Sequence, residues 1–386
     1  MSSQPGPSFG PTATVGILGT GQLGRMLALA ARRMGYSVIT TGDDPPGSPC
    51  GQVAEPVEDL ATFLARAEVV TTEFENVDPA VLAAAALSRP GPSVLARCQN
   101  RRLEKAFLRE AGVPTVRHRV VGDSDASGDT GGDNRVDDAA LRRELAAFGL
   151  PSVLKTAAFG YDGKGQWVLR DDADLAAVPL DAGPYVLEEL VDLAAEVSVV
   201  VGRGHDGATA WYPVIENRHA HHILDVSVAP ARIDAALADR AVQLAVTVAE
   251  ALEAVGVLCV EFFVTTDRQL LVNEVAPRPH NSGHLTIEAA PTSQFEQQLR
   301  TVCGLPLGAT APFRPAAMAN LLGELWSEGE PNWSAALAVP GVSLHLYGKA
   351  EARPGRKMGH LTAVASTPGE ALELVVDARR RLSLRP

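Results

Sequence analysis

Short apolar runs alternate with amphipathic stretches between residues 15 and 115 of the chain. The apolar runs have the length and composition of strands, and the stretches between them repeat apolar residues at helical spacing. We predict strands at 14–18, 37–41, 69–73 and 93–95, with helices at 22–34, 60–67 and 79–87. Strands that alternate with helices are typical of an α/β fold with a doubly wound parallel sheet.

A charged amphipathic helix predicted at 100–111 is followed by a different pattern. Residues 122–138 are rich in Asp, Gly and Ser, and we predict a mobile acidic insertion there because the stretch lacks ordered metal-ligand spacing. From Leu150 onward the chain becomes β-rich. We predict strands at 152–155, 166–169, 185–189 and 197–201, a long helix at 233–254 and two strands around 265–268. A proline-rich joint at 305–315 then leads into a small β-containing part.

The composition places the chain among ordinary globular proteins. It has 386 residues, of which 46% are hydrophobic and 21% charged, so we expect two or three domains and exclude collagen-like, coiled-coil and disordered architectures. Lys and Arg number 34 against 46 Asp and Glu, which gives a net charge of −12. That balance argues against nucleic acid or an anionic membrane as the main partner.

The four cysteines lie far apart, without the spacing of a metal knuckle, a redox motif or a disulfide framework. Residues 1–14 are rich in Pro, Gly and Ser and lack the features of a signal peptide, so we expect a flexible N-terminal tail. Charges interrupt every apolar run of membrane-spanning length. Together these observations favour a cytoplasmic protein.

A glycine-rich motif, Gly19-Thr20-Gly21-Gln22-Leu23-Gly24, fits G-x-G-x-x-G between the first predicted strand and the first predicted helix. Glycines at these positions permit a tight turn and let backbone amides approach an anion at the helix N-terminus. Asp43 and Asp44 follow about 20 residues later, where a dinucleotide fold would place a ribose-binding acid. Taken alone, the motif favours a nicotinamide enzyme, but a motif this short leaves the choice to the rest of the chain.

Two apolar runs flank the dipeptide Asp267-Arg268, as expected for a hairpin. If this dipeptide is a two-residue turn, Glu261 and Glu274 lie directly opposite each other, with Cβ atoms about 5 Å apart. Two carboxylates this close among apolar neighbours need a proton or a cation. Mg²⁺ suits such a pair together with phosphate oxygens, with Asn273 as a further oxygen donor. The alternative is two solvated acids on an exposed face.

A second glycine-rich stretch, Phe159 to Gln166, lies between two predicted strands and holds three glycines, a base and an acid. It lacks the Gly-Lys-Ser/Thr ending of a phosphate-binding P-loop. A mobile hairpin lid over phosphates fits this stretch better, with Lys155 on the preceding strand as a point charge. A plain glycine-rich turn is the alternative.

Longer motifs along the chain are G-Q-L-G-R-M, T-x-E-x-E-N, F-G-Y-D-G-K-G-Q, N-E-x-A-P-R-P-H-N-S-G-H and R-P-G-R-K-M-G-H. Lys105, Lys155, the lid stretch, Leu187–Val191, Glu196 and the Glu261/Glu274 hairpin together resemble an ATP-grasp enzyme. Within that superfamily, the longer motifs resemble the N5-carboxyaminoimidazole ribonucleotide synthetases of purine biosynthesis. The resemblance runs from about residue 15 to residue 361. The chain departs from it in the acidic insertion and at 157–159, where some relatives carry more glycine.

The resemblance implies an ATP-grasp fold with an N-terminal doubly wound parallel-sheet domain and a small β-rich C-terminal domain. The implied divisions are a flexible tail at 1–14, a Rossmann-like domain at 15–115, the ATP-grasp domain at 116–310 and the C-terminal domain at 311–386.

The resemblance also implies a nucleotide site in which ATP lies between two antiparallel sheets, with Mg²⁺ on Glu261 and Glu274. His219 shares a loop with two other histidines at a spacing that suits nucleotide or surface contacts better than a metal. The implied nucleotide-binding residues are Arg101, Lys105, Lys155, Gly160, Tyr161, Asp162, Gly163, Lys164, Gly165, Gln166, Glu188, Glu189, Leu190, Val191, Glu196, His219 and Asn273.

A second implied site holds 5-aminoimidazole ribonucleotide, and it gives the N-terminal glycine loop a role other than dinucleotide binding. The implied residues are Gln22, Leu23, Glu75, Arg278, His280, Asn281, Ser282, Lys349, Arg356 and Lys357. The implied catalytic residues are Glu75, Tyr161, Asp162, Arg278, His280 and Lys357. Glu75, or Asp162 through a water, would steer the proton of the amine.

The implied reaction starts with attack of bicarbonate on the γ-phosphate of ATP, which gives carboxyphosphate and ADP. A closed lid would exclude water until the ribonucleotide amine reacts. The partners are therefore ATP, bicarbonate and the ribonucleotide, and the resemblance implies a homodimer. A formate-dependent glycinamide ribonucleotide transformylase and a non-catalytic nucleotide-binding protein are the alternatives. R-P-G-R-K-M-G-H argues against the former, and the intact Glu261/Glu274 pair argues against the latter.

Overall fold

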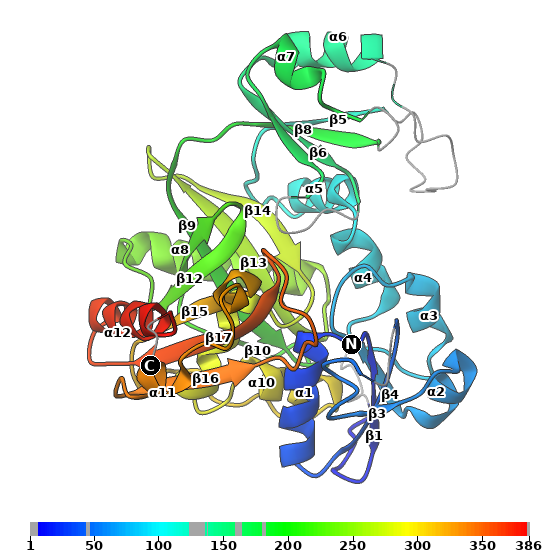
Figure 1. Ribbon diagram of the computed structural model, residues 1–386. Helices are drawn as coiled ribbons and strands as arrows, with labels where there is room; N and C mark the ends of the chain where they lie inside the picture. The colour runs from blue at the N-terminus through cyan, green and yellow to red at the C-terminus, as the bar shows by residue number, and fades with distance from the viewer. Residues whose placement is uncertain are drawn as a thin grey trace.

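The N-terminal part of the chain folds as a four-stranded parallel sheet with helices on both faces (Figure 1). The computed structural model describes residues 7–43, 47–122, 136, 138–158, 164–179 and 183–383. The strand order is β3-β2-β1-β4, with β1 at Thr14–Leu18, β2 at Ser37–Thr41, β3 at Glu55–Pro56 and β4 at Val69–Thr72. The helices are α1 (Gln22–Arg33), α2 (Leu60–Arg66), α3 (Pro79–Ala84), α4 (Pro92–Cys98) and α5 (Arg101–Glu110). The predicted parallel sheet is confirmed.

One predicted strand of this part is wrong. Residues 93–95 lie in helix α4, which has Pro92 in its first turn, where the fixed φ of proline suits a helix. The apolar side chains of this short run are buried, but a run of three residues cannot distinguish a buried strand from a buried helix by periodicity. The fourth strand of the sheet is the short β3 instead, which pairs with β2.

A small antiparallel sheet forms the upper lobe in Figure 1. Its order is β5-β8-β6-β7, with β5 at His118–Val121, β6 at Ser152–Thr156, β7 at Gln166–Leu169 and β8 at Tyr185–Glu189. Helices α6 (Asp138–Phe148) and α7 (Asp172–Leu175) pack against it. The predicted acidic insertion at 122–138 leads into α6 and lies largely outside the described residues.

A nine-stranded antiparallel sheet forms the body of the molecule, below the upper lobe in Figure 1. Its order is β14-β13-β9-β11-β12-β15-β17-β16, and β10 pairs with β9. The strands are β9 (Leu193–Arg203), β10 (Thr209–Trp211), β11 (Ile215–Ala220), β12 (Ile223–Ala229), β13 (Gly256–Thr265), β14 (Leu270–Ala276), β15 (Ala316–Leu322), β16 (Val342–Leu346) and β17 (Lys357–Val364). The strands of the C-terminal part, β15 to β17, thus extend the sheet that β9 to β14 begin.

Helices cover both faces of this large sheet. They are α8 (Ala235–Ala251), η1 (Asn281–Leu285), α9 (Thr286–Ala289), α10 (Gln294–Val302), η2 (Gly323–Trp326), α11 (Trp333–Leu337) and α12 (Pro368–Arg381). None of the helices in the described ranges is both long enough and apolar enough to cross a membrane.

Alternation along the central strands separates the core from the site. On β13, Leu258, Val260 and Phe262 point into the apolar cluster under α8. The residues between them, among them Glu261, point to the opposite face, because successive strand residues alternate between faces. On β9, Ser198 lies directly opposite Glu261 and so shares that second face. Polar side chains thereby collect on the face that η1 and the upper lobe overlook.

Candidate active site

The carboxylate pair predicted on the hairpin of β13 and β14 is present. Glu261 and Glu274 are register partners on these adjacent strands. The turn differs from the prediction, because Thr265 pairs with Gln269 around a three-residue loop that places Arg268 at a φ of 67°. An extra residue on β14, Asn273, then forms a bulge that restores the register at the two acids. The predicted two-residue turn is therefore wrong, although the pairing that it implied is confirmed.

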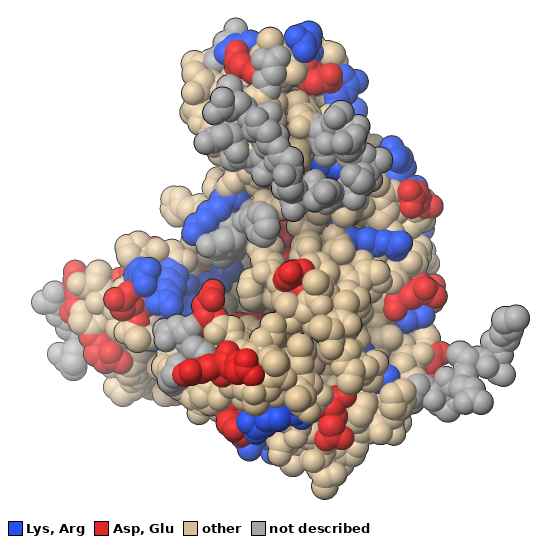
Figure 2. Space-filling model, turned by 90° about the vertical axis from the view of Figure 1, so that its right-hand side faces the viewer, with Lys and Arg blue, Asp and Glu red and all other residues tan. Residues whose placement is uncertain are grey.

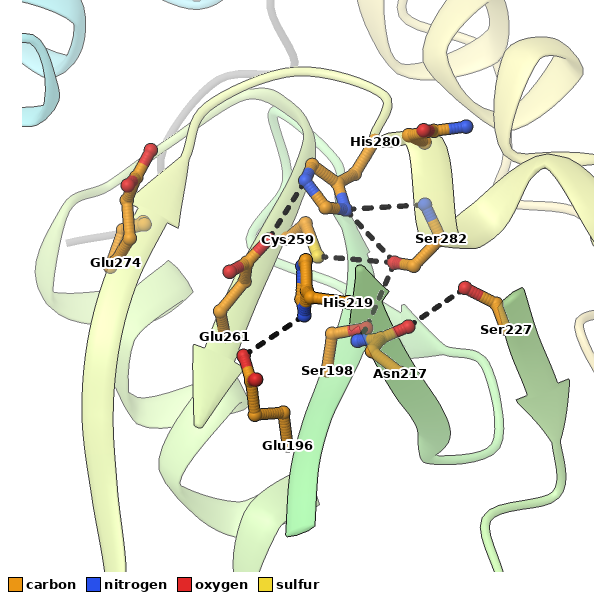
Figure 3. A network of polar contacts seen from close by, with 12 residues as sticks. Glu196, Ser198, Asn217, His219, Ser227, Cys259, Glu261, Glu274, His280 and Ser282 are labelled. Atoms are coloured by element: carbon orange, nitrogen blue, oxygen red, sulfur yellow. Dashed lines mark hydrogen bonds and ion pairs between the residues drawn. The ribbon is translucent and has the colours of Figure 1, made fainter. Parts of the chain in front are cut away.

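The two acids of this pair are in unlike surroundings (Figure 3). His280 Nε2 lies 2.9 Å from Glu261 Oε1, while Arg101 Nη2 lies 3.7 Å from Glu274 Oε2. Burial raises the pKa of Glu274, and the neighbouring Glu261 carboxylate raises it further. Burial opposes ionisation of Glu261 as well, but His280 holds the pKa of Glu261 below its usual value. Two carboxylates that share one face offer the oxygen ligands that a divalent cation takes.

A second cluster links the upper lobe to α5. The Glu188 carboxylate lies between two lysines, with Lys155 Nζ at 2.7 Å and Lys105 Nζ at 3.1 Å. Glu188 and Lys105 are fully buried, and Lys155 is nearly so. Burial opposes ionisation of Glu188, but Lys155 and Lys105 outweigh it and lower the pKa of Glu188 to about 2. Both lysines also reach β14, since Lys105 donates to Asn273 O at 3.2 Å and Lys155 to Asn273 Oδ1 at 3.3 Å.

Helix α5 holds these two clusters together. Its residues Arg101, Glu104 and Lys105 share one face, because positions three and four apart lie together on a helix. Arg101 donates to Thr156 O in the upper lobe at 3.2 Å, and Glu104 accepts from the backbone N–H of Val275 at 2.6 Å. Burial raises the pKa of Glu104 to about 8. Glu104 was not among the predicted site residues, and no spacing rule distinguishes it from other helix glutamates.

The N-terminal glycine loop is closed by a carboxylate of the chain itself. Glu73, just beyond β4, accepts from the backbone N–H of Gly21 and, at 2.7 Å, from that of Gly24. Burial raises the pKa of Glu73. The donors that would hold a pyrophosphate in a dinucleotide fold are therefore already satisfied. Glu73 was not singled out from the sequence, although it is the first Glu of T-x-E-x-E-N and that motif could have indicated it.

The second Glu of that motif forms an ion pair across the domains. Glu75 and Arg278 make two parallel hydrogen bonds, one of them from Nη2 to Oε1 at 2.9 Å. Burial opposes ionisation of Glu75, but Arg278 lowers the pKa of Glu75 below its usual value. We call this pair of hydrogen bonds between Arg278 and Glu75 the fork. Because Arg278 lies four residues beyond Glu274, the fork joins the carboxylate pair to the N-terminal domain.

The other residues predicted for the ribonucleotide lie near this junction or inside the fold. Gln22 and Leu23 begin α1 and are half-buried. The charge of Lys349 acts on Glu73 and partly offsets the burial that raises the pKa of Glu73. Lys357 begins β17, and Arg356 Nη1 donates to Glu351 O at 2.9 Å. By contrast, two predicted side chains of η1 are turned inward. Asn281 forms a reciprocal amide pair with Asn320, and Ser282 is fully buried.

The predicted adenine and ribose residues lie along β8 and at the start of β9. Glu189 forms an exposed ion pair with Arg117 at 2.9 Å, and Leu190 and Val191 follow it in the link to β9. Glu196 Oε2 lies 3.1 Å from His219 Nδ1 on β11. Burial opposes protonation of His219, but the hydrogen bond to Glu196 outweighs burial and raises the pKa of His219.

Part of the predicted lid lies outside the described residues, namely Phe159, Gly160, Tyr161, Asp162 and Gly163. Beyond it, Gly165 has a φ of 69° and its carbonyl accepts from Thr156 N at 2.8 Å, and Gln166 Nε2 lies 3.4 Å from His222 Nδ1. Lys164 is exposed. The surface is hollowed below the upper lobe, and acidic and basic side chains are visible in the recess (Figure 2).

Comparison with known proteins agrees with this geometry. Three family models match the chain. They are the ribonucleotide synthetase preATP-grasp domain at residues 12–99, the ATP-grasp domain at 134–295 and the phosphoribosylaminoimidazole carboxylase C-terminal domain at 316–374. The chain is 39% identical to the N5-carboxyaminoimidazole ribonucleotide synthase of Bacillus subtilis, over 95% of each chain. The synthase of Brucella melitensis is 41% identical, over 92% of this chain and 98% of its own. The chain belongs to the N5-carboxyaminoimidazole ribonucleotide synthase family.

Solved structures of this family share the whole fold. The synthetase from Thermus thermophilus is 40% identical with a TM-score of 0.83, over 96% of this chain and 99% of the other. A structure described as the Aspergillus clavatus synthase with ADP and 5-aminoimidazole ribonucleotide is 30% identical with a TM-score of 0.82, over 96% and 99%. The predicted family, ATP-grasp fold and class of ATP-dependent ligase are confirmed.

In a synthase of this family, the glycine loop is expected to shape the ribonucleotide site and not to bind a phosphate. A Cβ at Gly21 would lie 2.7 Å from Glu73 Oε1, so Gly21→Val must displace that carboxylate. We expect Gly21→Val to weaken ribonucleotide binding roughly tenfold or more, about 1.4 kcal/mol, while ATP affinity is kept. Calorimetry with each ligand measures both. Gly369→Val is the control, since a Cβ there meets nothing within 4 Å. Micromolar binding of NAD(H) would contradict this assignment.

Proposed function

We propose that this protein carboxylates 5-aminoimidazole ribonucleotide with bicarbonate and ATP, giving N5-carboxyaminoimidazole ribonucleotide, ADP and phosphate through carboxyphosphate, as a step of purine biosynthesis. The observation that carries the proposal is the fork between Arg278 and Glu75. It ties the carboxylate pair, where a phosphoryl group would be transferred, to the glycine loop of the N-terminal domain. A phosphorylated bicarbonate formed at one side would need only a short path to an amine held at the other.

The nucleotide half of the proposed site rests on Lys105, Lys155 and Glu188. Two buried ammonium groups around one carboxylate leave one surplus positive charge for phosphate oxygens. Glu261 and Glu274 would hold Mg²⁺, because they are register partners on one face and Mg²⁺ prefers carboxylate and phosphate oxygens. When bound, Mg²⁺ would offset the charge that develops on the phosphates during phosphoryl transfer.

The acceptor half of the proposed site rests on Arg278, Lys349 and Lys357. The planar guanidinium of Arg278, already oriented by Glu75, would present its remaining donors to bicarbonate and then to carboxyphosphate. Glu75 is bound to Arg278, so it would act on the amine proton only if the substrate rearranges this fork. Lys349, Arg356 and Lys357 would bind the 5′-phosphate of the ribonucleotide and Lys357 would close the pocket over it.

A coupled assay of ADP release tests the proposed reaction. We expect release that requires both 5-aminoimidazole ribonucleotide and bicarbonate, and that formate does not support. Release that depends on glycinamide ribonucleotide and formate, and ignores bicarbonate, would transfer the assignment to the transformylase. ATP binding without turnover under every combination would indicate a nucleotide-binding protein. We further propose a cytoplasmic homodimer, on the strength of the family resemblance.

A further inference from the structure

A buried chain of hydrogen bonds runs from His280 into the large sheet (Figure 3). His280 Nδ1 lies 2.9 Å from Ser282 Oγ, and Ser282 Oγ lies 2.8 Å from Ser198 Oγ. Asn217 Nδ2 donates to Ser198 Oγ at 2.9 Å, and Ser227 Oγ donates to Asn217 Oδ1 at 2.8 Å. The three serines are fully buried and Asn217 is 7% exposed. The chain thus joins η1, β9 and the hairpin of β11 and β12.

Several contacts fix the surroundings of the His280 ring. Asn217 Nδ2 can only donate, so Ser198 Oγ accepts from it, while either hydroxyl can donate in the contact between Ser198 and Ser282. The backbone N–H of Ser282 also lies 3.3 Å from His280 Nδ1. On the other side of the ring, Nε2 must carry a proton to bond with a carboxylate.

That proton faces the carboxylate pair. His280 Nε2 lies 2.9 Å from Glu261 Oε1, so a ring protonated on Nε2 donates to one oxygen of Glu261 and leaves the other free. The backbone N–H and carbonyl of His280 are both hydrogen-bonded as well. Gln294 Oε1 accepts from His280 N at 2.9 Å, and Gln294 Nε2 donates to His280 O at 2.7 Å. Both the position of this histidine and the rotation of its ring are therefore set from inside the fold.

Four buried polar side chains are a costly way to fill a sheet interface, because each loses water and must be paired. Apolar residues fill the equivalent face under α8. The polar chain has one end at Ser227 and the other at His280, beside the proposed metal-binding acid. Outer groups that orient a ligand to a metal typically alter metal affinity or activity when they are removed.

We propose that Ser198 and Asn217 are positioning residues for catalysis, which act through Ser282 to fix the orientation of His280 against Glu261. This inference rests on the proposed function. Neither side chain is expected to touch substrate. If Ser198 or Asn217 is lost, the Ser282 hydroxyl loses the support of this chain, and the His280 ring loses a fixed partner at Nδ1.

Steady-state kinetics and ¹⁵N NMR of the full-length protein test this inference. We expect Ser198→Ala and Asn217→Leu to lower kcat by on the order of tenfold, while KM for ATP and for the ribonucleotide changes little. In histidine-labelled protein at fixed pH, the ring resonances of His280, assigned by their loss in His280→Gln, should shift in both variants relative to the wild-type protein. Ser198→Ala is the smaller change and covers the case in which Asn217→Leu fails to fold.

Ser152→Ala is the matched control, because Ser152 is also a fully buried strand serine and its hydroxyl has no hydrogen-bond partner among the described residues. It should leave kcat and the His280 resonances unchanged. Unchanged kcat and an unchanged His280 spectrum in Ser198→Ala would overturn the inference, as would a loss of kcat that follows lowered thermal stability while the His280 resonances stay unchanged. If the wild-type protein itself shows no release of ADP that depends on ribonucleotide and bicarbonate, the proposed function fails instead.

Discussion

Glu261→Gln or Glu274→Gln is expected to lower the rate of ribonucleotide-dependent ADP release by roughly 10²-fold or more. Each change removes one of two negative charges that would hold Mg²⁺ against the transferring phosphate. Because burial and the like charge of Glu261 raise the pKa of Glu274, removing that charge should not destabilise the metal-free protein. Turnover at varied Mg²⁺, together with thermal unfolding without Mg²⁺, measures both effects.

The matched control for this prediction is Glu216→Gln. Glu216 lies on the same sheet, but it is one residue from Asn217 and so points to the opposite face, where it pairs with Arg232. It should keep normal turnover. Near-normal ADP release by either hairpin variant at ordinary Mg²⁺ would contradict the assignment of the metal ligands.

Arg278→Lys is expected to lower ribonucleotide carboxylation by about 10²- to 10³-fold, on the order of 2–4 kcal/mol of transition-state stabilisation. Lysine keeps the charge but cannot make the two parallel hydrogen bonds to Glu75 while it presents further donors to carboxyphosphate. His280 beside Glu261 makes a comparable contribution, so His280→Gln should also lose carboxylation. ATP binding should survive in both variants, because Lys105, Lys155 and Glu188 are untouched. Steady-state carboxylation and nucleotide titration give the two quantities separately.

Arg66→Lys is the control for Arg278→Lys. Arg66 makes the same two-bond fork to Glu55, at 2.7 and 2.8 Å, but on the exposed surface. It should keep normal carboxylation, since an exposed ion pair contributes little. Loss of nucleotide binding in Arg278→Lys equal to its loss of carboxylation would contradict the role given to Arg278.

Local sequence pattern predicted the elements that carry their own periodicity. The strands at Thr14–Leu18 and Ser37–Thr41 have the predicted bounds, and the helix that begins at Gln22 ends one residue earlier than predicted. At 93–95 the prediction failed because three apolar residues hold too little periodic information, and the proline that starts α4 decided the outcome. The predicted pairing of Glu261 with Glu274 is correct although the predicted two-residue turn is not, because a longer turn and the bulge at Asn273 offset each other.

The sequence by itself determined the family, the ATP-grasp fold and the opposed pair Glu261 and Glu274, because those signals lie in contiguous motifs or in one hairpin. Tertiary structure alone decided what each polar side chain faces. Glu75 and Arg278 are 203 residues apart, and the chain from Ser227 to His280 draws on four separate segments. Serine, asparagine and glutamate are common at many positions, so nothing local marks the few whose partners arrive only when distant strands pair. Burial then favours those pairings, because each polar group left unpaired inside the sheet costs about 1–3 kcal/mol.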